Sequence, residues 1–423
     1  MKAVIHAGNF HAGPHRVELP SSKSISNRML IIQHLCPQPL FLHHLSSAKD
    51  TSTLVELLKK IKEKNTGNLD TGPAGTTFRF LTALLSITEG THFLTGSERM
   101  KERPVETLVN ALRSLGADIM YTERNGFPPL KITGKKITGG ELVMNTSVSS
   151  QFVSAMMLIA TEMQNGLTIH FSEKPVSWPY IRMTAELMQL QGISIRLNEN
   201  FVQISPGNYK KGDFTIEADW SSASYWYEVA ALSEECEIHL GGLSKNSLQA
   251  DVTAAAIFEK FGVKTFYHPT GIILSKEKNP GLPNRFEYNF SDCPDIAQTV
   301  ACTCAGLGIE AHLSGLSTLR IKETDRISAL ITELKKLNIS CETKKNDELI
   351  ILSQKNHASP DGSWLIPHGS ISTYHDHRMA LAFAPLSLKC AEISIENPGV
   401  VEKSYPLWWN DLSKAGFHIN YVN

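Results

Sequence analysis

The feature that most restricts the fold is a phrase that recurs about every 75 residues: an amphipathic helix end, a glycine and a β-branched strand start. It occurs in "NALRSLGADI", "AELMQLQGISI", "AIFEKFGVKT" and "DLSKAGFHI". "TELKKLNIS" also fits, because Asn tolerates the left-handed conformation that glycine supplies after a helix. In the weaker "ELLKKIKEK", the same position is predicted to be Lys62. The five clear markers are 76, 70, 76 and 78 residues apart: Gly116, Gly192, Gly262, Asn338 and Gly416.

A second phrase alternates with the first and consists of a polar or glycine-rich opening followed by an almost wholly apolar or small-residue helix. Both series predict six units, of which the first is about twenty residues short. Each unit is predicted to hold one amphipathic and one buried helix, with strands in alternating stretches such as "PLKITG" and "LIIL". The second phrase is marked, in steps of 52, 74, 72, 73 and 82 residues, by Ser24, Thr76, Ser150, Ser222, Asp295 and His377.

These units predict an α/β architecture. A helix that is apolar on all sides must be enclosed, so the six buried helices are expected inside sheets and outer helices. Six units make too large a core for one domain, and we expect two domains of three units each. One domain is predicted at 1–18 plus 219–423 and the other, inserted domain at 19–218. Because helix N-termini attract anions, their polar first turns are predicted to meet at a ligand cleft.

Composition excludes several classes of partner. The 423 residues are 42% hydrophobic and 20% charged with a formal net charge of −1, which gives no general reason to expect nucleic acid or an anionic membrane. No apolar stretch approaches the length of about 18 residues that a membrane span needs. The seven cysteines form no CxxC pair, which favours buried thiols in a reducing cytoplasm.

Cationic residues cluster beside the polar helix starts. Any one of them alone is more simply a solvated charge or part of a structural ion pair. As a set they suit a ligand with two phosphate or carboxylate groups, since Arg matches such groups with a planar fork. The set is Lys23, Arg28, Arg79, Arg99, Lys322, Arg326, Arg378 and Lys403.

The stretch "STLRIKETDRISALITELKKLN" is predicted to contain a helix with Thr324 as its N-cap and Arg326 in its first turn. A cation there opposes the helix dipole, which is reasonable if an anion binds beside it. Asp295 and Glu323 are the nearest carboxylates in the pattern and are candidates for proton transfer. A salt bridge or a helix cap is an equally good interpretation of each.

Other chemistries fit the sequence poorly. In "HDHRM" the two histidines are at i and i+2, which directs helical side chains to different sides and disfavours metal binding. "GPAGTTFR" lacks the GK[ST] ending of a nucleotide-hydrolysing loop. Ser149–Ser150–Gln151 has no nearby His/Asp phrase that would favour a serine nucleophile.

Together, the phrases resemble the 5-enolpyruvylshikimate-3-phosphate (EPSP) synthase family, the 3-phosphoshikimate 1-carboxyvinyltransferases. Ten motifs occur in family order over nearly the whole chain: "LPSSKSISNR", "AGTTFR", "RMKERPVETLVNAL", "VSSQF", "SWPYI", "SSASY", "PDIAQT", "KETDR", "DHRMA" and "VVEKSYP". The resemblance implies a two-domain enolpyruvyl transferase fold of six βαβαββ-type repeats. Three repeats per domain would be related by pseudo-threefold symmetry, with the ligand cleft between the domains.

The resemblance also implies a reaction. The enolpyruvyl group of phosphoenolpyruvate would pass to the 5-hydroxyl of shikimate 3-phosphate with release of phosphate, in chorismate and aromatic amino-acid biosynthesis. The enzyme would be a cytoplasmic monomer that needs no metal or organic cofactor and binds neither nucleic acid nor membrane.

The same resemblance assigns site residues. Asp295 would be the base at the hydroxyl and Glu323 and Lys403 the proton carriers, with Lys23 also counted as catalytic. Shikimate 3-phosphate would be held by Lys23, Ser24, Arg28, Ser149, Ser150, Gln151, Ser177, Tyr180, Asp295 and Lys322. Phosphoenolpyruvate would be held by Lys23, Gly75, Arg99, Gln151, Arg326, Arg378 and Lys403.

The chain departs from the family pattern at a few positions. Thr318 replaces an asparagine expected to bind the sugar phosphate, and the shortened first unit lacks a segment where the family usually has extra strands. Ser21, Pro73 and His375 replace a glycine and two asparagines. Three rival interpretations remain: a sister enzyme acting on a UDP-amino sugar, a non-catalytic paralogue that binds phosphorylated sugars, and a structural repeat protein.

Overall fold

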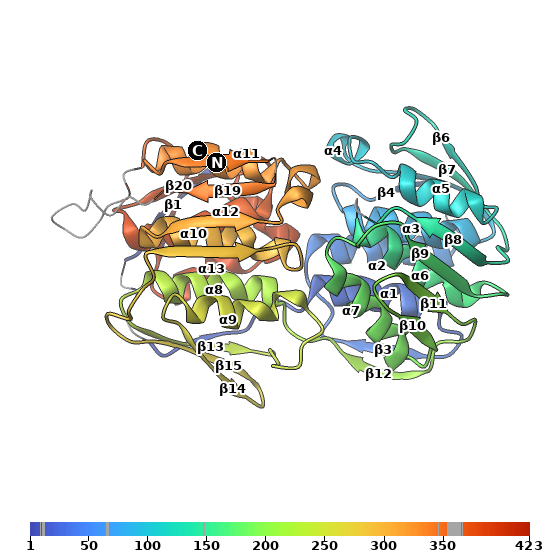
Figure 1. Ribbon diagram of the computed structural model, residues 1–423, viewed down its shortest axis with the longest axis horizontal. Coiled ribbons are helices and arrows are strands. Elements are labelled where there is room, and N and C mark those ends of the chain that lie inside the picture. The colour runs from blue at the N-terminus through green and yellow to red at the C-terminus, as the bar shows by residue number, and fades with distance from the viewer. Residues whose placement is uncertain are drawn as a thin grey trace. The chain divides into compact units, whose positions relative to one another are not determined.

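The computed structural model describes residues 1–8, 10, 13–64, 67–146, 149–345, 347–352, 365 and 367–423. By its internal contacts the chain forms two compact units. Unit 1 comprises Met1–Pro20 and Glu217–Asn423, and unit 2 comprises Ser21–Ile216. Figure 1 shows the elements of both units. None of the helices in the described part of the chain combines the length and apolarity needed to cross a bilayer.

Unit 1 is built on three buried helices, α8 (Trp220–Leu232), α10 (Ala297–Leu307) and α12 (His377–Phe383). Every residue of α8 except Ser221 is buried, and so is every residue of α12. This confirms the prediction of enclosed helices. The other helices of unit 1 are α9 (Ala254–Glu259), α11 (Arg326–Lys336), α13 (Trp408–Lys414) and the 3-10 helices η2 (Ala250–Thr253), η3 (Pro294–Ile296), η4 (Ser317–Ile321), η5 (Ala384–Lys389) and η6 (Pro398–Lys403).

Each buried helix of unit 1 packs on a different sheet. Helix α8 contacts the sheet ordered β14 (Lys264–His268), β15 (Gly271–Lys276), β13 (Cys236–Gly241), β2 (His15–Val17). Helix α10 contacts the sheet ordered β16 (Arg285–Asn289), β17 (Glu310–Ser314), β19 (Glu348–Ile351), β18 (Cys341–Lys344). Helix α12 contacts the sheet ordered β20 (Ile393–Glu396), β1 (Lys2–His6), β21 (His418–Val422). Because β1 pairs antiparallel with β21, the two chain ends lie together (Figure 1).

Unit 2 repeats this scheme with the buried helices α1 (Lys23–Leu35), α3 (Gly75–Ile87) and α6 (Ser150–Ile159). All of α6 is buried except Gln151, and all of α3 except Thr76 and Ile87. In α6 and α8 the residue that is not buried is therefore a polar one in the first turn, and in α3 the polar first-turn Thr76 is one of two such residues. The other helices of unit 2 are α2 (Lys49–Lys62), α4 (Glu98–Lys101), α5 (Glu106–Ser114), α7 (Trp178–Leu190) and η1 (Ala160–Glu162).

One sheet of unit 2 is small. Strand β3 (Leu40–His43) pairs in parallel with β12 (Gly212–Thr215) in a two-stranded sheet. The other two sheets have four strands each. They are ordered β4 (Asn68–Asp70), β5 (Gly90–Thr95), β7 (Leu130–Gly134), β6 (Asp118–Tyr121), and β10 (Ile195–Leu197), β11 (Phe201–Ile204), β9 (Leu167–Phe171), β8 (Gly140–Met144). The small sheet belongs to the repeat that the sequence shows to be short.

The helix ends predicted from the repeat are confirmed in five units. The marker residues have φ between 61° and 105°, where a glycine or asparagine is least strained. They follow α5, α7, α9, α11 and α13, and are Gly116, Gly192, Gly262, Asn338 and Gly416.

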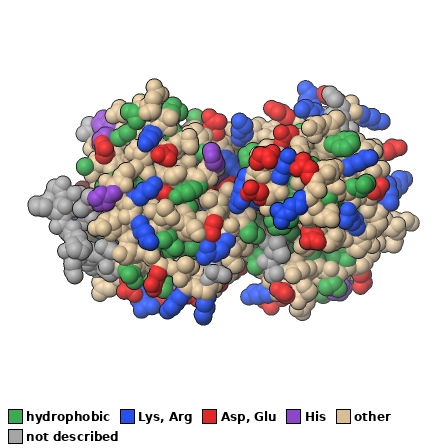
Figure 2. Space-filling model, turned by 90° about the horizontal axis from the view of Figure 1, so that it is seen from above, with side chains coloured by type: hydrophobic (Ala, Val, Ile, Leu, Met, Phe, Trp, Pro, Cys, Tyr) green, Lys and Arg blue, Asp and Glu red, His purple; other side chains and the backbone are tan. Residues whose placement is uncertain are grey.

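The prediction for the first unit was wrong by two residues. Lys62 is still helical, and the left-handed residue is Lys64, with φ of 55°. Helix α2 continues because nothing in "KKIKEK" breaks it before the chain turns. On the face drawn in Figure 2, Lys and Arg side chains are interspersed with Asp and Glu, in keeping with the near-zero net charge.

Candidate active site

In unit 1, a network of ion pairs and hydrogen bonds joins the first turn of α12 to the first turn of α8, through Ser221, and to Asp295, two residues before α10. Arg378, the second residue of α12, donates from Nη1 to the hydroxyl of Tyr225 on α8 at 3.1 Å. Its Nη2 is 3.2 Å from Oδ2 of Asp295 in η3, which leads into α10. Arg378 is 7% exposed, so the polar starts of three apolar helices converge on a nearly buried cation.

Arg326, the first residue of α11, is the centre of this network and is 1% exposed. Its Nε is 2.7 Å from Asp376 Oδ2, its Nη2 is 2.9 Å from Glu323 Oε2, and its Nη1 is 3.4 Å from Asp295 Oδ1. Burial by itself lowers the pKa of Arg326, but the charges of Asp376, Glu323 and Asp295 raise it overall. The guanidinium is therefore held as a cation in a site that excludes water.

The N-cap of α11 differs from the prediction. Asp325, not Thr324, accepts a hydrogen bond from the backbone N–H of Ser328 at 3.1 Å. Aspartate is a strong N-cap, and the adjacent Arg320 ion pair, at 2.8 Å, holds its carboxylate in place.

Two lysines complete the unit 1 network. Lys403 Nζ is 2.8 Å from Glu323 Oε1, and Lys322 Nζ is 3.9 Å from Asp295 Oδ1. Four cations thus meet the carboxylates of Asp295, Glu323 and Asp376. All six site residues that the sequence predicted for this unit belong to it: Asp295, Lys322, Glu323, Arg326, Arg378 and Lys403.

Several members of the network were missed in the sequence. Asp376 caps α12 by accepting from the N–H of Arg378 at 3.0 Å and also binds Arg326; an Asp directly before an apolar helix was the available signal. Ser221 donates to Asp251, which is 2% exposed and lies in η2. No motif in "LQADVT" indicated Asp251.

In unit 2, a second polar cluster joins the first turns of α1, α2 and α3. Lys23, the first residue of α1, has its Nζ 3.2 Å from Oδ2 of the buried Asp50 on α2. Thr77 on α3 donates to the carbonyl of Asp50 at 3.0 Å. The first turn of α1, with its sequence "SKS", is therefore linked to the first turn of α2 by an ion pair, and α2 is linked to the first turn of α3 by a hydrogen bond.

Gln151 extends this cluster to α6. Its Oε1 accepts from Arg79 Nη1 at 3.0 Å and its Nε2 donates to Thr76 Oγ1 at 3.1 Å. Ser149 caps α6 by accepting from the N–H of Gln151, and Ser150 is the first helical residue. Both ends of the Gln151 amide are thus fixed by α3.

Gly75 lies under two guanidinium groups. A Cβ there would be 2.6 Å from Arg79 Nη1 and would also collide with Arg103 Nη1. Arg103 is 7% exposed and was not singled out in the sequence. The predicted Arg99, in α4, is in contrast 43% exposed in its side chain and is 2.7 Å from Glu102 of the same helical turn.

Arg28 is mainly an internal anchor. Its Nε donates to Thr184 at 2.7 Å, Nη1 to the carbonyl of Ser24 at 2.9 Å, and Nη2 to Ser154 and to the carbonyl of Tyr180. These bonds account for four of its five N–H groups. Burial lowers its pKa to about 10. Arg28 therefore positions Ser24 and Tyr180, and its predicted contact with the sugar phosphate is limited to one N–H.

Two more predicted positions have distinctive geometry. Ser177, directly before α7, has φ of 53° and is 6% exposed, a strained conformation for a non-glycine residue. Thr318, one of the departures from the family pattern in unit 1, has a buried hydroxyl without a hydrogen-bond partner among the described residues. Nowhere in the described ranges do three or more His, Cys, Asp or Glu side chains form a group able to hold a metal ion.

The family model described as EPSP synthase (3-phosphoshikimate 1-carboxyvinyltransferase) matches residues 14–412. The chain belongs to the EPSP synthase family. Relatives named 3-phosphoshikimate 1-carboxyvinyltransferase are similar over almost their whole length. The one from Bacteroides fragilis (strain YCH46) is 45% identical over 406 residues, 95% of each chain. The one from Aliivibrio salmonicida (strain LFI1238) is 32% identical over 425 residues, 94% of this chain and 96% of that protein.

The fold is also that of a solved EPSP synthase. The structure from Acinetobacter baumannii superposes with a TM-score of 0.78 over the full length of both chains at 21% identity. This confirms the predicted α/β enolpyruvyl transferase fold of mixed sheets and helices. In this member of the EPSP synthase family, the KETDR motif supplies Lys322, Glu323 and Arg326 to the unit 1 network. The DHRMA motif supplies Asp376 and Arg378.

Proposed function

We propose that this chain transfers the enolpyruvyl group of phosphoenolpyruvate to the 5-hydroxyl of shikimate 3-phosphate, with release of phosphate, in chorismate and aromatic amino-acid biosynthesis. The observation that carries the proposal is the unit 1 network, in which Arg326, Arg378 and Lys403 are largely buried and share the carboxylates of Asp295 and Glu323. These three cations suit a ligand with phosphate and carboxylate groups. Family membership supplies the substrate class.

Asp295 is the proposed base at the sugar hydroxyl. Its two carboxylate oxygens are divided between Arg326 and Arg378, at 3.4 and 3.2 Å, and Lys322 lies 3.9 Å away. The carboxylate would accept the proton as the hydroxyl oxygen attacks C2 of phosphoenolpyruvate.

Glu323 and Lys403 are the proposed proton carriers at C3. Their 2.8 Å contact is short enough for direct proton transfer, and the other oxygen of Glu323 is held by Arg326. One of them would give a proton to C3 to form a tetrahedral intermediate. The intermediate would then lose phosphate and a C3 proton, which returns to the same pair.

Residues of unit 2 would hold the remaining groups. The absence of a side chain at Gly75 lets the guanidinium groups of Arg79 and Arg103 approach the start of α3, and Gln151 presents an amide fixed by α3. We assign phosphoenolpyruvate contacts to Lys23, Gly75, Arg99, Gln151, Arg326, Arg378 and Lys403. We assign shikimate 3-phosphate contacts to Lys23, Ser24, Arg28, Ser149, Ser150, Gln151, Ser177, Tyr180, Asp295 and Lys322.

The enzyme would act on small molecules as a cytoplasmic monomer. The free cysteines, Cys36, Cys236, Cys293, Cys302, Cys304, Cys341 and Cys390, support a reducing compartment. The formal net charge of −1 supports neither nucleic acid nor an anionic membrane as a partner.

The deciding experiment measures phosphate release from phosphoenolpyruvate with shikimate 3-phosphate and, separately, with a UDP-amino sugar. We expect release only with shikimate 3-phosphate and undiminished in a chelator. Asp295→Asn should lose most activity while it keeps its circular dichroism spectrum. Equal release with the UDP-sugar would assign the chain to the sister reaction, and no release with either would favour a non-catalytic binding protein.

A further inference from the structure

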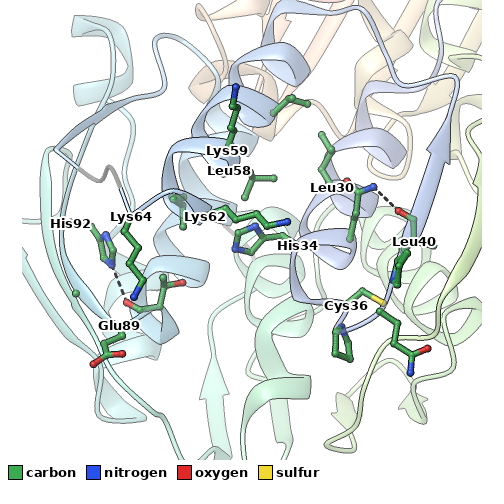
Figure 3. A pocket seen from close by; sticks show the side chains of 18 residues that line it. Leu30, His34, Cys36, Leu40, Leu58, Lys59, Lys62, Lys64, Glu89 and His92 are labelled. Carbon is green, nitrogen blue, oxygen red and sulfur yellow. Dashed lines mark hydrogen bonds between the residues drawn. The ribbon is translucent and has the colours of Figure 1, made fainter.

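Unit 2 contains a pocket of about 1190 Å³, lined by the ends of α1 and α2 and the turn after α3 (Figure 3). Two of its polar side chains are bonded within the wall: Gln33 donates to the carbonyl of Leu40 at 2.6 Å, and the ring of His92 donates to that of Thr88 at 2.9 Å. Its charged side chains are of both signs, with lysines from the end of α2 beside Glu89. This lining specifies no ligand, whereas a buried charge in unit 1 has a more definite role.

Helix α11 carries that charge two turns after Arg326. Glu333 is fully buried, and its spacing of seven residues from Arg326 places both side chains on the same face of the helix. A carboxylate is buried at a tolerable cost only where donors surround it. The donors to Glu333 therefore show what this face of α11 holds in place.

Two of these donors come from the segment that leads into α12. Glu333 Oε2 accepts from the backbone N–H of Ser372 at 3.0 Å, and Oε1 accepts from the hydroxyl of Tyr374 at 2.7 Å. Lys336, one turn later on α11, supplies a counter-charge at 2.7 Å from Oε2. Burial and the hydrogen bond to Glu333 raise the pKa of Tyr374 to about 12, so the phenol keeps the proton that it donates.

The same segment has a strained backbone. Tyr374 and His375 have φ of 50° and 56°, in the left-handed region that non-glycine residues, and bulky ones above all, adopt rarely. Such conformations persist only where the surrounding contacts hold them. Ile371, before this turn, is fixed by a β-bridge to β20, and Asp376 follows the turn directly. The direction in which the chain reaches Asp376 thus depends on two unfavourable residues.

Helix α11 holds this part of the chain at two points. Arg326, at its start, binds the side chain of Asp376, and Glu333, about 10 Å further along the helix, binds the turn that precedes Asp376. If the second contact is lost, the left-handed turn can relax toward an ordinary conformation. Asp376 would then shift against Arg326.

We propose that Glu333, acting through Tyr374, is a positioning residue for the phosphoenolpyruvate site. It keeps Asp376 where that residue pairs with Arg326 and caps the helix that presents Arg378. The role rests on the proposed function, since phosphoenolpyruvate is the ligand assigned to both arginines.

Tyr374→Phe tests the contact, because it removes one hydroxyl from a side chain that is 36% exposed and leaves every charge of the network in place. KM for phosphoenolpyruvate should rise about fivefold, while kcat and KM for shikimate 3-phosphate stay within about twofold. Tyr267→Phe, which removes a phenol of similar exposure on β14, should keep wild-type kinetics. Glu333→Gln should raise the same KM at least as much; if it does not fold, Tyr374→Phe decides.

A second substitution tests whether the turn carries the effect. Asparagine adopts the left-handed conformation with less strain than histidine. Adding His375→Asn to Tyr374→Phe should therefore restore at least about half of the lost affinity for phosphoenolpyruvate, although the hydroxyl remains absent. A hydroxyl that acted only by stabilising α11 would not be replaced in this way.

The Nε–H of Arg326 reports the pairing without any substrate. It donates to Asp376 at 2.7 Å from a residue that is 1% exposed, so its NMR signal should exchange slowly in the wild type and in Tyr267→Phe. In Tyr374→Phe it should exchange faster at an unchanged free energy of unfolding. If the wild type released no phosphate, the proposed function would fail and this exchange rate alone would decide the positioning role. An unchanged exchange rate, equal rises in both KM values, or no recovery in the double variant would overturn the proposal.

Discussion

The guanidinium of Arg326 lies across the carboxylate of Asp376 in a two-point contact, with Nε 2.7 Å from Oδ2 and Nη2 3.3 Å from Oδ1. Both side chains are almost fully buried, and the two residues are 50 positions apart in the sequence. The same carboxylate caps α12 at the N–H of Arg378. One aspartate therefore positions both arginines proposed to bind phosphoenolpyruvate.

Removing the negative charge of Asp376 should lower the free energy of unfolding substantially. Asp376→Asn leaves Arg326 buried without its main counter-ion, and breaking a buried pair typically costs about 3–5 kcal/mol. Urea unfolding should show a loss of that order. Asp325→Asn is the matched control, because Asn still caps α11 and only the partly exposed ion pair with Arg320 is weakened, which should cost less than about 1 kcal/mol. Equal losses would show that the buried pair of Arg326 with Asp376 stabilises the protein no more than the exposed pair of Arg320 with Asp325.

Arg378→Ala should impair catalysis without unfolding the protein. A charge-assisted contact to phosphoenolpyruvate is worth about 1.5–3 kcal/mol, so kcat/KM for phosphoenolpyruvate should fall at least about tenfold. Arg320→Ala, which loses a pair with Asp325 outside the network, should keep wild-type kinetics. An unfolded Arg378→Ala protein that binds phosphoenolpyruvate normally once stabilised would make the arginine structural.

Gly75→Ala should weaken phosphoenolpyruvate binding selectively. The new methyl group displaces the ends of the Arg79 and Arg103 side chains, which can move without disturbing the backbone. KM for phosphoenolpyruvate should rise about tenfold while that for shikimate 3-phosphate changes little. Gly67→Ala adds a methyl group with no heavy atom within 4 Å and serves as the control. Unchanged KM values in steady-state assays would remove Gly75 from the site.

Asp251 should give phosphoenolpyruvate binding a pH dependence. Burial and the charge of Asp295 raise the pKa of Asp251 to about 7, although Arg378 and Ser221 act in the opposite direction. As pH rises through 7, ionisation adds negative charge beside Arg378, so KM for phosphoenolpyruvate should increase. In Asp251→Asn this increase between pH 6 and 8 should disappear, whereas exposed Asp292→Asn should retain it. A pH profile shared by all three proteins would contradict the role of Asp251.

Glu228 should make the protein less stable as pH rises. It is fully buried in α8, no described group bonds to its carboxylate, and burial raises its pKa well above 4.5. The folded state keeps the proton that the unfolded state loses above about pH 4.5, so the free energy of unfolding falls with rising pH, by about 1.4 kcal/mol per unit until the folded carboxyl ionises.

Chemical denaturation from pH 4.5 to 8 tests this. Glu228→Gln should lack this part of the slope and should exceed the wild type in stability most at pH 8, while Glu56→Gln, on the exposed face of α2, should follow the wild type. If the free energy of unfolding depends on pH in the same way for the wild type and Glu228→Gln, the Glu228 carboxyl must have a hydrogen-bond or charge partner.

The sequence by itself determined the repeating units and the helix ends. Gly116, Gly192, Gly262, Asn338 and Gly416 could be predicted because a left-handed residue after a helix is a local requirement of the backbone. Buried helices could be predicted because apolar residues on every side leave no face for water. Six charged residues of the unit 1 network could be predicted from motifs, whereas Asp376 and Asp251 were missed.

Only the tertiary structure decided which partners those residues have. Arg326 binds Asp376, and Arg378 binds Tyr225 from 153 positions earlier, because packing brings α8, α11 and α12 together. Likewise, Arg28 proves to be an anchor because Thr184, Ser154 and Tyr180 surround it. Periodicity fixes local conformation and burial, which depend on near neighbours. Hydrogen bonds between distant residues depend on three-dimensional packing, which leaves no periodic trace in the chain.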